Sequence, residues 1–227
     1  MSAFLETFVR YAPEWTERLL PAMLVTMAIT FLSYACALVI AILVEWARGL
    51  RVSAIDLIID AYVAVARGVP ILAILYLLYF GLPSAGILLS SFQAGVLGIS
   101  LVYGAYLAEI FRAGIASLHK GQREAAAAVG MTPAQSFAYV IVPQAVRTML
   151  PPLLVTFISL LKDSSICALI AVNELVLTSR VMMAEYFLPL HIFMIVGLFY
   201  FVIAWPLSLL ARLLEKRLTR GRRLLAA

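Results

Sequence analysis

The sequence predicts an all-α integral membrane protein, and three observations lead to this prediction. The 227-residue chain is 64% hydrophobic, and its mean hydropathy of +1.04 exceeds what a soluble core of this length could bury. Runs of about 20 mostly apolar residues recur along the chain, each long enough to cross a hydrocarbon core of about 30 Å as a helix. Lysines and arginines gather in alternate connections between these runs, which is typical of a multi-pass topology.

Five apolar runs predict five transmembrane helices. The expected spans cover roughly 19–44, 57–80, 92–115, 145–161 and 190–214. A backbone in lipid must satisfy its polar groups within the segment, and the alternating pattern of a membrane β-barrel is absent from the sequence, so helices are expected. Because the sequence has no internal repeat and no low-complexity linker, we predict a single transmembrane domain over residues 1–227.

The distribution of charge predicts which side of the membrane each terminus occupies, because Lys and Arg near span ends are retained in the cytoplasm. The remaining connections are uncharged or net acidic, so we expect the N-terminus outside and the C-terminus inside. The formal charge of +5 then reports topology, and no nucleic-acid partner is expected. The residues on the predicted cytoplasmic side are Arg48, Arg51, Arg112, Lys120, Arg123, Arg147, Arg212, Lys216, Arg217, Arg220, Arg222 and Arg223.

The connection between the third and fourth spans contains the stretch GQREAAAAVGMTPAQSFAYVIVP, residues 121–143. Its alanine-rich start predicts a short helix, because alanine has the highest helix propensity, and Gly130 suits the left-handed position that ends a helix. Thr132 is placed as the N-cap of a second helix, with Pro133 at the first position and Gln135 completing a capping box. We therefore predict a helix, a sharp turn and a second helix.

Two interpretations of the first short helix are open. It is too polar at its start and too short to span a bilayer, and its alanines allow another surface to approach the backbone closely, as small residues do at packed interfaces. The helix would then be a docking element. Any connection between spans can also carry an alanine-rich surface helix without a partner, and residue chemistry alone does not separate the two.

The residues of this connection resemble the EAA loop of permease subunits from ATP-binding-cassette (ABC) importers. The resemblance lies in Glu124-Ala125-Ala126, the later Gly130, and Val140-x-Val142-Pro143. In that family the loop, here about 117–143, forms a coupling helix that sits in a cleft of a cytoplasmic ATPase. The resemblance implies a role in ATPase coupling for Gly121, Glu124, Ala125, Ala126, Gly130 and Pro143. The predicted cytoplasmic side is where that role requires the loop.

Further motifs resemble the permeases of polar amino acid importers, whose members handle histidine, glutamate, glutamine, arginine, cystine and opines. The resemblance covers roughly residues 20–215 and implies the type I permease fold with five spans, in the cytoplasmic (inner) membrane of a prokaryote. Val69 replaces a threonine common in the family, and Leu154-Val155 stand where many relatives have Gly-Asn, so the particular amino acid stays open. The motifs are ARGVP at 66–70, YFGLP at 79–83, AYLAEIFR at 105–112, GQ at 121–122 and LKDSS at 161–165.

Ionisable residues inside predicted spans form a second group of candidates, because a charge at the bilayer centre costs about 2.5 to 3.5 kcal/mol. Asp56, Asp60 and Arg67 share one face of the second span and are expected to face the bundle interior. Pro70 lacks a backbone donor and its ring clashes one turn back, so the helix should kink near Gly68. Mutual pairing, gating and substrate contact are all open for this group.

Glu109 and Arg112 lie three positions apart on the inner half of the third span, so they can pair across one helical turn. In the resemblance, this segment is shared by members with different substrates. A structural or transmission role is therefore favoured over substrate selection.

The fourth span ends in the cluster Lys162, Asp163, Ser164 and Ser165. Successive residues on a helix point about 100° apart, so Lys162 and Asp163 need not pair with each other. We hypothesise that Asp163 and the two serine hydroxyls line an amino acid site that faces a central cavity, with a structural salt bridge as the alternative. Asp163 would suit an ammonium group, whereas Lys162 or Arg67 could receive a carboxylate.

The chain lacks the sequence features of an enzyme. No nucleophile with a base, metal-ligand set or cofactor motif appears, and no GxxxxGK[ST] loop is present to cradle phosphates. ATP and Mg²⁺ are therefore expected on a separate ATPase dimer. Five helices are too few to enclose a pathway, which implies pairing with a second permease, either itself or a homologue. The resemblance adds an extracytoplasmic substrate-binding protein, and membrane lipid surrounds the spans.

The rival function is an ion-driven secondary transporter of small amino-acid-like solutes that uses Asp56, Asp60 and Asp163. Inverted repeats with paired broken helices would be its signature. Five spans without visible internal duplication argue against it. We therefore predict the permease subunit of an ATP-driven importer that moves a polar amino acid or a derivative inward.

Overall fold

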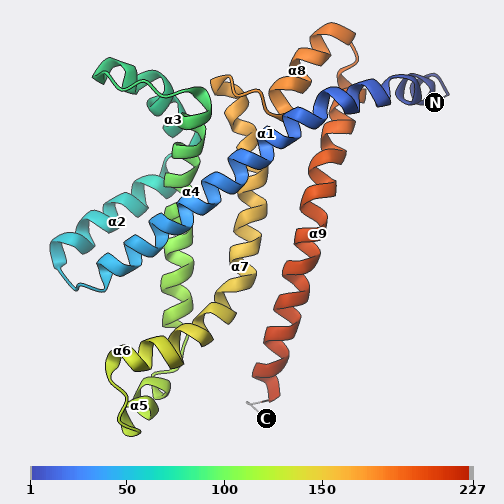
Figure 1. Cartoon of the computed structure of the whole chain (residues 1–227). Helices are drawn as coiled ribbons and strands as arrows, with labels where there is room; N and C mark the ends of the chain where they lie inside the picture. Colours follow the sequence, from blue (N-terminus) through green and yellow to red (C-terminus); the bar gives the residue numbers. More distant parts are fainter. Residues whose placement is uncertain (1, 225–227) are drawn as a thin grey trace.

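The computed structural model describes residues 2–224, and these residues contain helices and no strand, as the predicted all-α class requires (Figure 1). Two short π-helical segments, η1 and η3, and two 3₁₀ segments, η2 and η4, interrupt or extend the α-helices. The elements are α1 (Ser2–Arg48), α2 (Ser53–Gly68), α3 (Ile71–Tyr76), η1 (Leu77–Gly81), η2 (Leu82–Ala85), α4 (Ser91–Ala116), α5 (Gly121–Ala128), α6 (Pro133–Gln135), η3 (Ser136–Ile141), α7 (Val142–Asp163), η4 (Ser164–Ile170), α8 (Leu175–Tyr186) and α9 (Pro189–Leu224).

Four helical stretches are long and apolar enough to cross a membrane, and they contain the first, third, fourth and fifth predicted spans. They cover Phe4–Arg48, Ser91–Ala116, Pro133–Ile170 and Pro189–Leu218. The first is longer than expected, since 47 residues of α1 extend about 70 Å at 1.5 Å per residue. That length is about twice a hydrocarbon core of about 30 Å, so α1 is longer than a perpendicular crossing requires.

The second predicted span, 57–80, is not one helix. α2 and α3 meet at a bend of 106° and would make a fifth span only if the bent pair counts as one. Val69 and Pro70 between them are extended, with ψ angles of 134° for both. Proline disfavours helical geometry at its preceding residue and lacks an N–H donor, and here the expected kink near Gly68 is a full break.

The main core lies where α1 crosses α4 (Figure 1). Small residues let the two backbones approach closely, as at other membrane helix contacts. A Cβ atom on Gly104 of α4 would lie 2.6 Å from Cγ2 of Ile40 on α1. Nearby, the Ser100 hydroxyl donates to the Ser33 carbonyl of α1 at 3.2 Å. α4 also contacts α2, α3 and α7, which makes it the central helix of the described chain.

A second core cluster joins the N-terminal part of α1 to α8 and α9. Trp15 and Leu19 of α1 are fully buried with Leu175 and Met182 of α8. The N-terminus and α8 lie at the upper end of Figure 1, whereas α5, α6 and the C-terminus lie at the lower end. The segments predicted to be cytoplasmic after the third span therefore share one end. The side chains of Arg220, Arg222 and Arg223, which were counted in predicting orientation, lie outside the described part of the structure.

Candidate functional site

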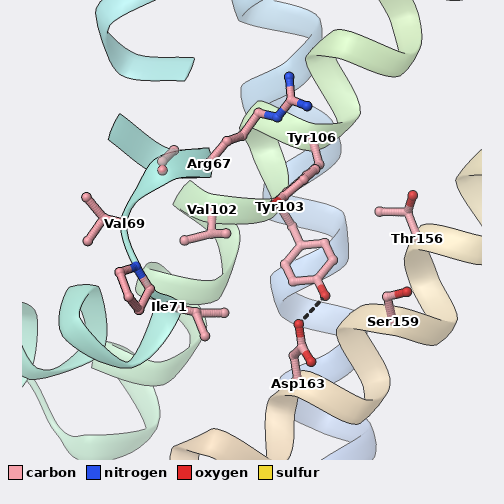
Figure 2. A pocket seen from close by; sticks show the side chains of 12 residues that line it. Arg67, Val69, Ile71, Val102, Tyr103, Tyr106, Thr156, Ser159 and Asp163 are labelled. Atoms are coloured by element: carbon pink, nitrogen blue, oxygen red, sulfur yellow. Dashed lines mark hydrogen bonds between the residues drawn. The ribbon is translucent and has the colours of Figure 1, made fainter. Parts of the chain in front are cut away.

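A cavity of about 540 Å³ lies between the α2–α3 break, α4 and α7 (Figure 2). This size falls within the range of small-molecule sites in proteins, about 300 to 1,000 Å³. The backbone break contributes one wall, since the end of α2, the extended residues Val69 and Pro70, and the start of α3 all line the cavity. The lining residues are Ala66, Arg67, Gly68, Val69, Pro70, Ile71, Val102, Tyr103, Tyr106, Thr156, Ser159 and Asp163.

The polar wall of the cavity is one face of α7. Thr156, Ser159 and Asp163 are spaced by three and four residues, which places them in a row along a helix. The Tyr103 hydroxyl of α4 donates to Oδ2 of Asp163 at 2.6 Å (Figure 2). This short, charge-assisted bond orients the carboxylate. The wall therefore presents two hydroxyls and one oriented carboxylate to any solute in the cavity.

The loop between α4 and α7 has the geometry that its sequence predicts. α5 ends in a left-handed turn at Gly130, whose φ is +81°. The Gly130 and Met131 amides donate to the Ala127 and Ala126 carbonyls at 3.0 and 3.1 Å, the paired bonds of a Schellman motif. Thr132 follows as an N-cap with a complete capping box. The predicted helix, turn and second helix start are confirmed.

The exposed surface of this loop includes both charged and apolar residues. Within α5, Ala126 is buried against the rest of the chain, while Glu124 and Ala125 are exposed. Val129, at the end of the helix, is 74% exposed and Tyr139 of η3 is 73% exposed. Ala125 and Val129 are therefore accessible on the surface of the loop.

Comparison with known proteins assigns the family. Residues 37–220 match the family described as "Binding-protein-dependent transport system inner membrane component". The chain belongs to this family. It is 35% identical over 214 residues to the probable glutamine ABC transporter permease protein GlnP of Bacillus subtilis, covering 92% of this chain and 97% of that protein. It is 37% identical to the glutamine transport system permease protein GlnP of Escherichia coli K12, covering 85% and 89%.

The fold of a solved transporter agrees with this family. A crystal structure of an amino acid ABC transporter with histidines contains a chain that is 33% identical to this permease, with a TM-score of 0.84, covering 93% of this chain and 97% of that one. The permease thus has the type I ABC permease fold. It is a transport subunit of the inner membrane. Its several long apolar helices are consistent with a chain that crosses the membrane more than once.

The structure separates the residues of the predicted cluster at the end of the fourth span. Asp163 lines the cavity, whereas Lys162 is exposed elsewhere and does not. Ser164 is fully buried and donates to the Leu161 carbonyl at 2.8 Å, and Ser165 donates to the Lys162 carbonyl at 2.6 Å. Both hydroxyls therefore close the helix end, and neither lines the cavity.

Most of the charged residues predicted in the second and third spans join an ion-pair network, and among these Arg67 also lines the cavity; the members are Asp60, Arg67, Glu109 and Arg112. Glu109 and Arg112 pair across one turn, with Nη2 of Arg112 2.6 Å from Oε2 of Glu109. Asp60 pairs with Arg48 at 2.9 Å, and its side chain is 65% exposed. The expectation that Asp60 faces the interior of the chain is wrong, because α2 buries Ile59, Val63 and Ala66 instead. Asp56 is partly exposed.

Four polar or aromatic lining residues were not predicted from the sequence: Tyr103, Tyr106, Thr156 and Ser159. The two hydroxyl residues precede Asp163 by seven and four positions, so helical periodicity was a signal that could have found them. No comparable signal exists for Tyr103, which lies 60 residues from Asp163. That contact depends on how α4 and α7 are rotated against each other.

Glu174, in the connection between η4 and α8, is fully buried. It is the N-cap of α8, where Oε1 accepts from the Leu177 amide at 2.8 Å, and Oε2 accepts from the Tyr200 hydroxyl at 3.3 Å. Burial raises the pKa of the Glu174 carboxyl. The residue ties α8 to α9, and it lies outside the candidate cavity.

Proposed function

We propose that this permease is the membrane-spanning subunit of an ATP-driven importer that moves a polar amino acid or a derivative inward. One observation carries the proposal: residues Pro133–Ile170 form a continuous helical stretch that begins at the Gly130 turn and contains Asp163. We infer that a displacement at the loop is transmitted along this continuous helical stretch to the cavity wall. The names of the two GlnP relatives support glutamine as the first amino acid to try.

The chemistry of the cavity suits an α-amino acid. Asp163 supplies a carboxylate for the substrate ammonium. Because Oδ2 accepts a hydrogen bond from Tyr103, we assign the ammonium to the second oxygen, Oδ1. Hydrogen bonds between charged groups contribute more than neutral ones, about 1.5 to 3 kcal/mol each. The hydroxyls of Thr156 and Ser159 can then bond a polar side chain. Lys162 and the two serines after Asp163 have no part in this site.

The proposed cycle requires partners. A separate ATPase dimer holds ATP and Mg²⁺ and receives α5 with the surrounding residues of the 117–143 loop. An extracytoplasmic binding protein delivers the amino acid, and a second permease, identical or homologous, completes the pathway. Closure of the ATPase dimer displaces α5, and α7 passes that displacement to Asp163. The N-terminus lies outside and the C-terminus inside in this assembly.

The decisive experiment compares Asp163→Asn with Asp56→Asn in the reconstituted permease, ATPase and binding protein. Asn keeps the shape of the side chain and removes the charge. We expect Asp163→Asn to weaken transport about 10- to 100-fold, from the loss of one charge-assisted hydrogen bond. Asp56→Asn makes the same chemical change away from the cavity and should transport like wild type. Unchanged uptake by Asp163→Asn at normal membrane levels would remove Asp163 from the substrate path.

Two further measurements separate this function from its rival. Purification of the tagged chain in mild detergent, followed by mass spectrometry, should recover an ATPase with a phosphate-binding loop and identify the second permease. Uptake should stop when the lysine of that loop is replaced. Transport that continues without a working ATPase would favour an ion-driven transporter.

A further inference from the structure

Three arginines from three helices converge on the single carboxylate of Glu109 in α4. Arg112, one turn further along α4, bonds both oxygens at 3.1 and 2.6 Å. Arg48, at the end of α1, places Nη2 3.7 Å from Oε1. Arg67, in the last turn of α2, places Nη1 3.8 Å from Oε2.

These three contacts are unequal. Arg112 makes two hydrogen bonds in the bidentate arrangement, which is the strongest way for arginine to hold a carboxylate. The Arg48 and Arg67 contacts are both longer than a hydrogen bond, but the Arg67 side chain is 45% exposed, against 22% for Arg48. Exposed ion pairs of this kind contribute only about 0 to 1 kcal/mol. Arg67 is therefore the partner that Glu109 releases most easily.

Arg67 is also the one of these three arginines that lines the cavity. Its guanidinium lies over the ring of Tyr106, 5.4 Å from the centroid, and Tyr106 lines the same cavity. In Figure 2 the Arg67 side chain points to one rim, while Asp163 stands on the opposite side. Arg67 and Asp163 thus stand on opposite sides of the cavity, and the guanidinium is turned away from Asp163 toward Glu109.

We propose that Glu109 is a positioning residue that competes with the carboxylate of the substrate for Arg67. The inference rests on the proposed function, with the substrate ammonium at Asp163. In the empty cavity Glu109 and the Tyr106 ring hold the guanidinium at the rim. A bound α-amino acid brings a second carboxylate, to which Arg67 can donate two hydrogen bonds. Glu109 keeps Arg112 when Arg67 leaves, so no charge is stranded.

The competition predicts that a substitution will tighten amino acid binding, whereas a substitution that merely disrupts the structure would weaken it. Glu109→Gln removes the competitor and leaves Arg67 on Tyr106, so amino acid binding should become tighter. We expect the Kd to fall about twofold to fivefold, the size of one exposed ion pair. Glu109→Asp keeps the charge and should bind like wild type. A ligand whose α-carboxylate is replaced by a carboxamide should bind Glu109→Gln and wild type equally.

The experiment measures equilibrium binding to the purified permease–ATPase complex without binding protein, so that the affinity belongs to the cavity. A mixture of radiolabelled L-amino acids identifies the bound amino acid, and the Kd of that amino acid and of its α-amide follows for each variant. The effect of Glu109→Gln should vanish in an Arg67→Gln background and persist in an Arg48→Gln background. Arg48 is the matched control, because it touches the same carboxylate and does not line the cavity.

Three outcomes overturn the inference: an unchanged or higher Kd for Glu109→Gln, an effect that survives Arg67→Gln, or no saturable amino acid binding by wild type. The proposed function is tested separately by ATP-dependent uptake with the binding protein present. Uptake by wild type together with any of the three outcomes rejects the competition alone. Absence of ATP-dependent amino acid uptake rejects the proposed function itself.

Discussion

Replacement of Gly130 by valine should uncouple the permease from its ATPase through backbone strain alone. Gly130 has a φ of +81°, and a Cβ atom built on it would meet nothing within 4 Å. The substitution therefore introduces no clash, and its cost is the strain of a side chain in the left-handed region, about 1 to 2 kcal/mol. For a β-branched residue this conformation is a genuine outlier, so the strain of valine should lie at the upper end of this energy range.

That energy is large enough to measure in an assay of ATPase docking. One to two kcal/mol changes a conformational ratio about 5- to 30-fold, so the affinity of the purified permease for its ATPase should fall by a similar factor. ATP-dependent uptake should fall with it, while membrane insertion survives. Gly130→Asn is a graded test, since asparagine tolerates the left-handed region better than other residues with a side chain.

Gly86 provides a matched control at the other end of the molecule. Its φ is +80°, its Cβ would also meet nothing within 4 Å, and its amide donates to the Pro83 carbonyl at 3.0 Å. Gly86→Val should therefore carry the same local strain and leave ATPase affinity unchanged. Full ATPase affinity in Gly130→Val, or an equal loss in Gly86→Val, would contradict the docking role of the loop.

Two further predictions concern packing and pH. Gly104→Ala should lower the free energy of unfolding of the detergent-solubilised permease by about 1 to 3 kcal/mol, because the new Cβ would lie 2.6 Å from Cγ2 of Ile40. A thermal unfolding measurement should detect the loss. Arg18 lowers the pKa of the Glu185 carboxyl from its ordinary value of 4.5. The stabilisation of the folded state by this ion pair is therefore present above about pH 4.5 and is lost as pH falls through the lowered pKa. Hydrogen exchange of α8 across an acid titration should detect that loss.

Each of these two predictions has a control. Gly197→Ala introduces a Cβ with nothing within 4 Å, so it should keep or slightly raise stability; a loss equal to that of Gly104→Ala would contradict the packing explanation. Glu185→Gln should abolish the acid-dependent change in α8. The same pH profile in wild type and Glu185→Gln would assign the change to another group.

The turn and the second helix start of the 117–143 loop could be predicted because their structure is local. The Gly130 turn and the Thr132 capping box depend on residues within five positions of each other. The break between α2 and α3 was only partly predictable. Pro70 supplies a local signal for a kink, but a 106° bend also requires α3 to pack elsewhere. It packs on α4, where Leu75 is fully buried against a glycine, and a Cβ on Gly98 would lie 2.6 Å from its Cδ2.

Hydropathy, charge and local backbone chemistry by themselves determined the all-α membrane class, four of the five span positions and the turn at Gly130. Each depends on neighbours in sequence or on transfer from water to lipid, which a sequence records directly. Only the tertiary structure showed that Asp163 accepts a hydrogen bond from Tyr103 and that Arg67 pairs with Glu109. It also showed that Ser164 and Ser165 lie outside the cavity. Those contacts depend on helix rotation and crossing, because one residue of register turns a side chain by about 100° and points it at a different partner.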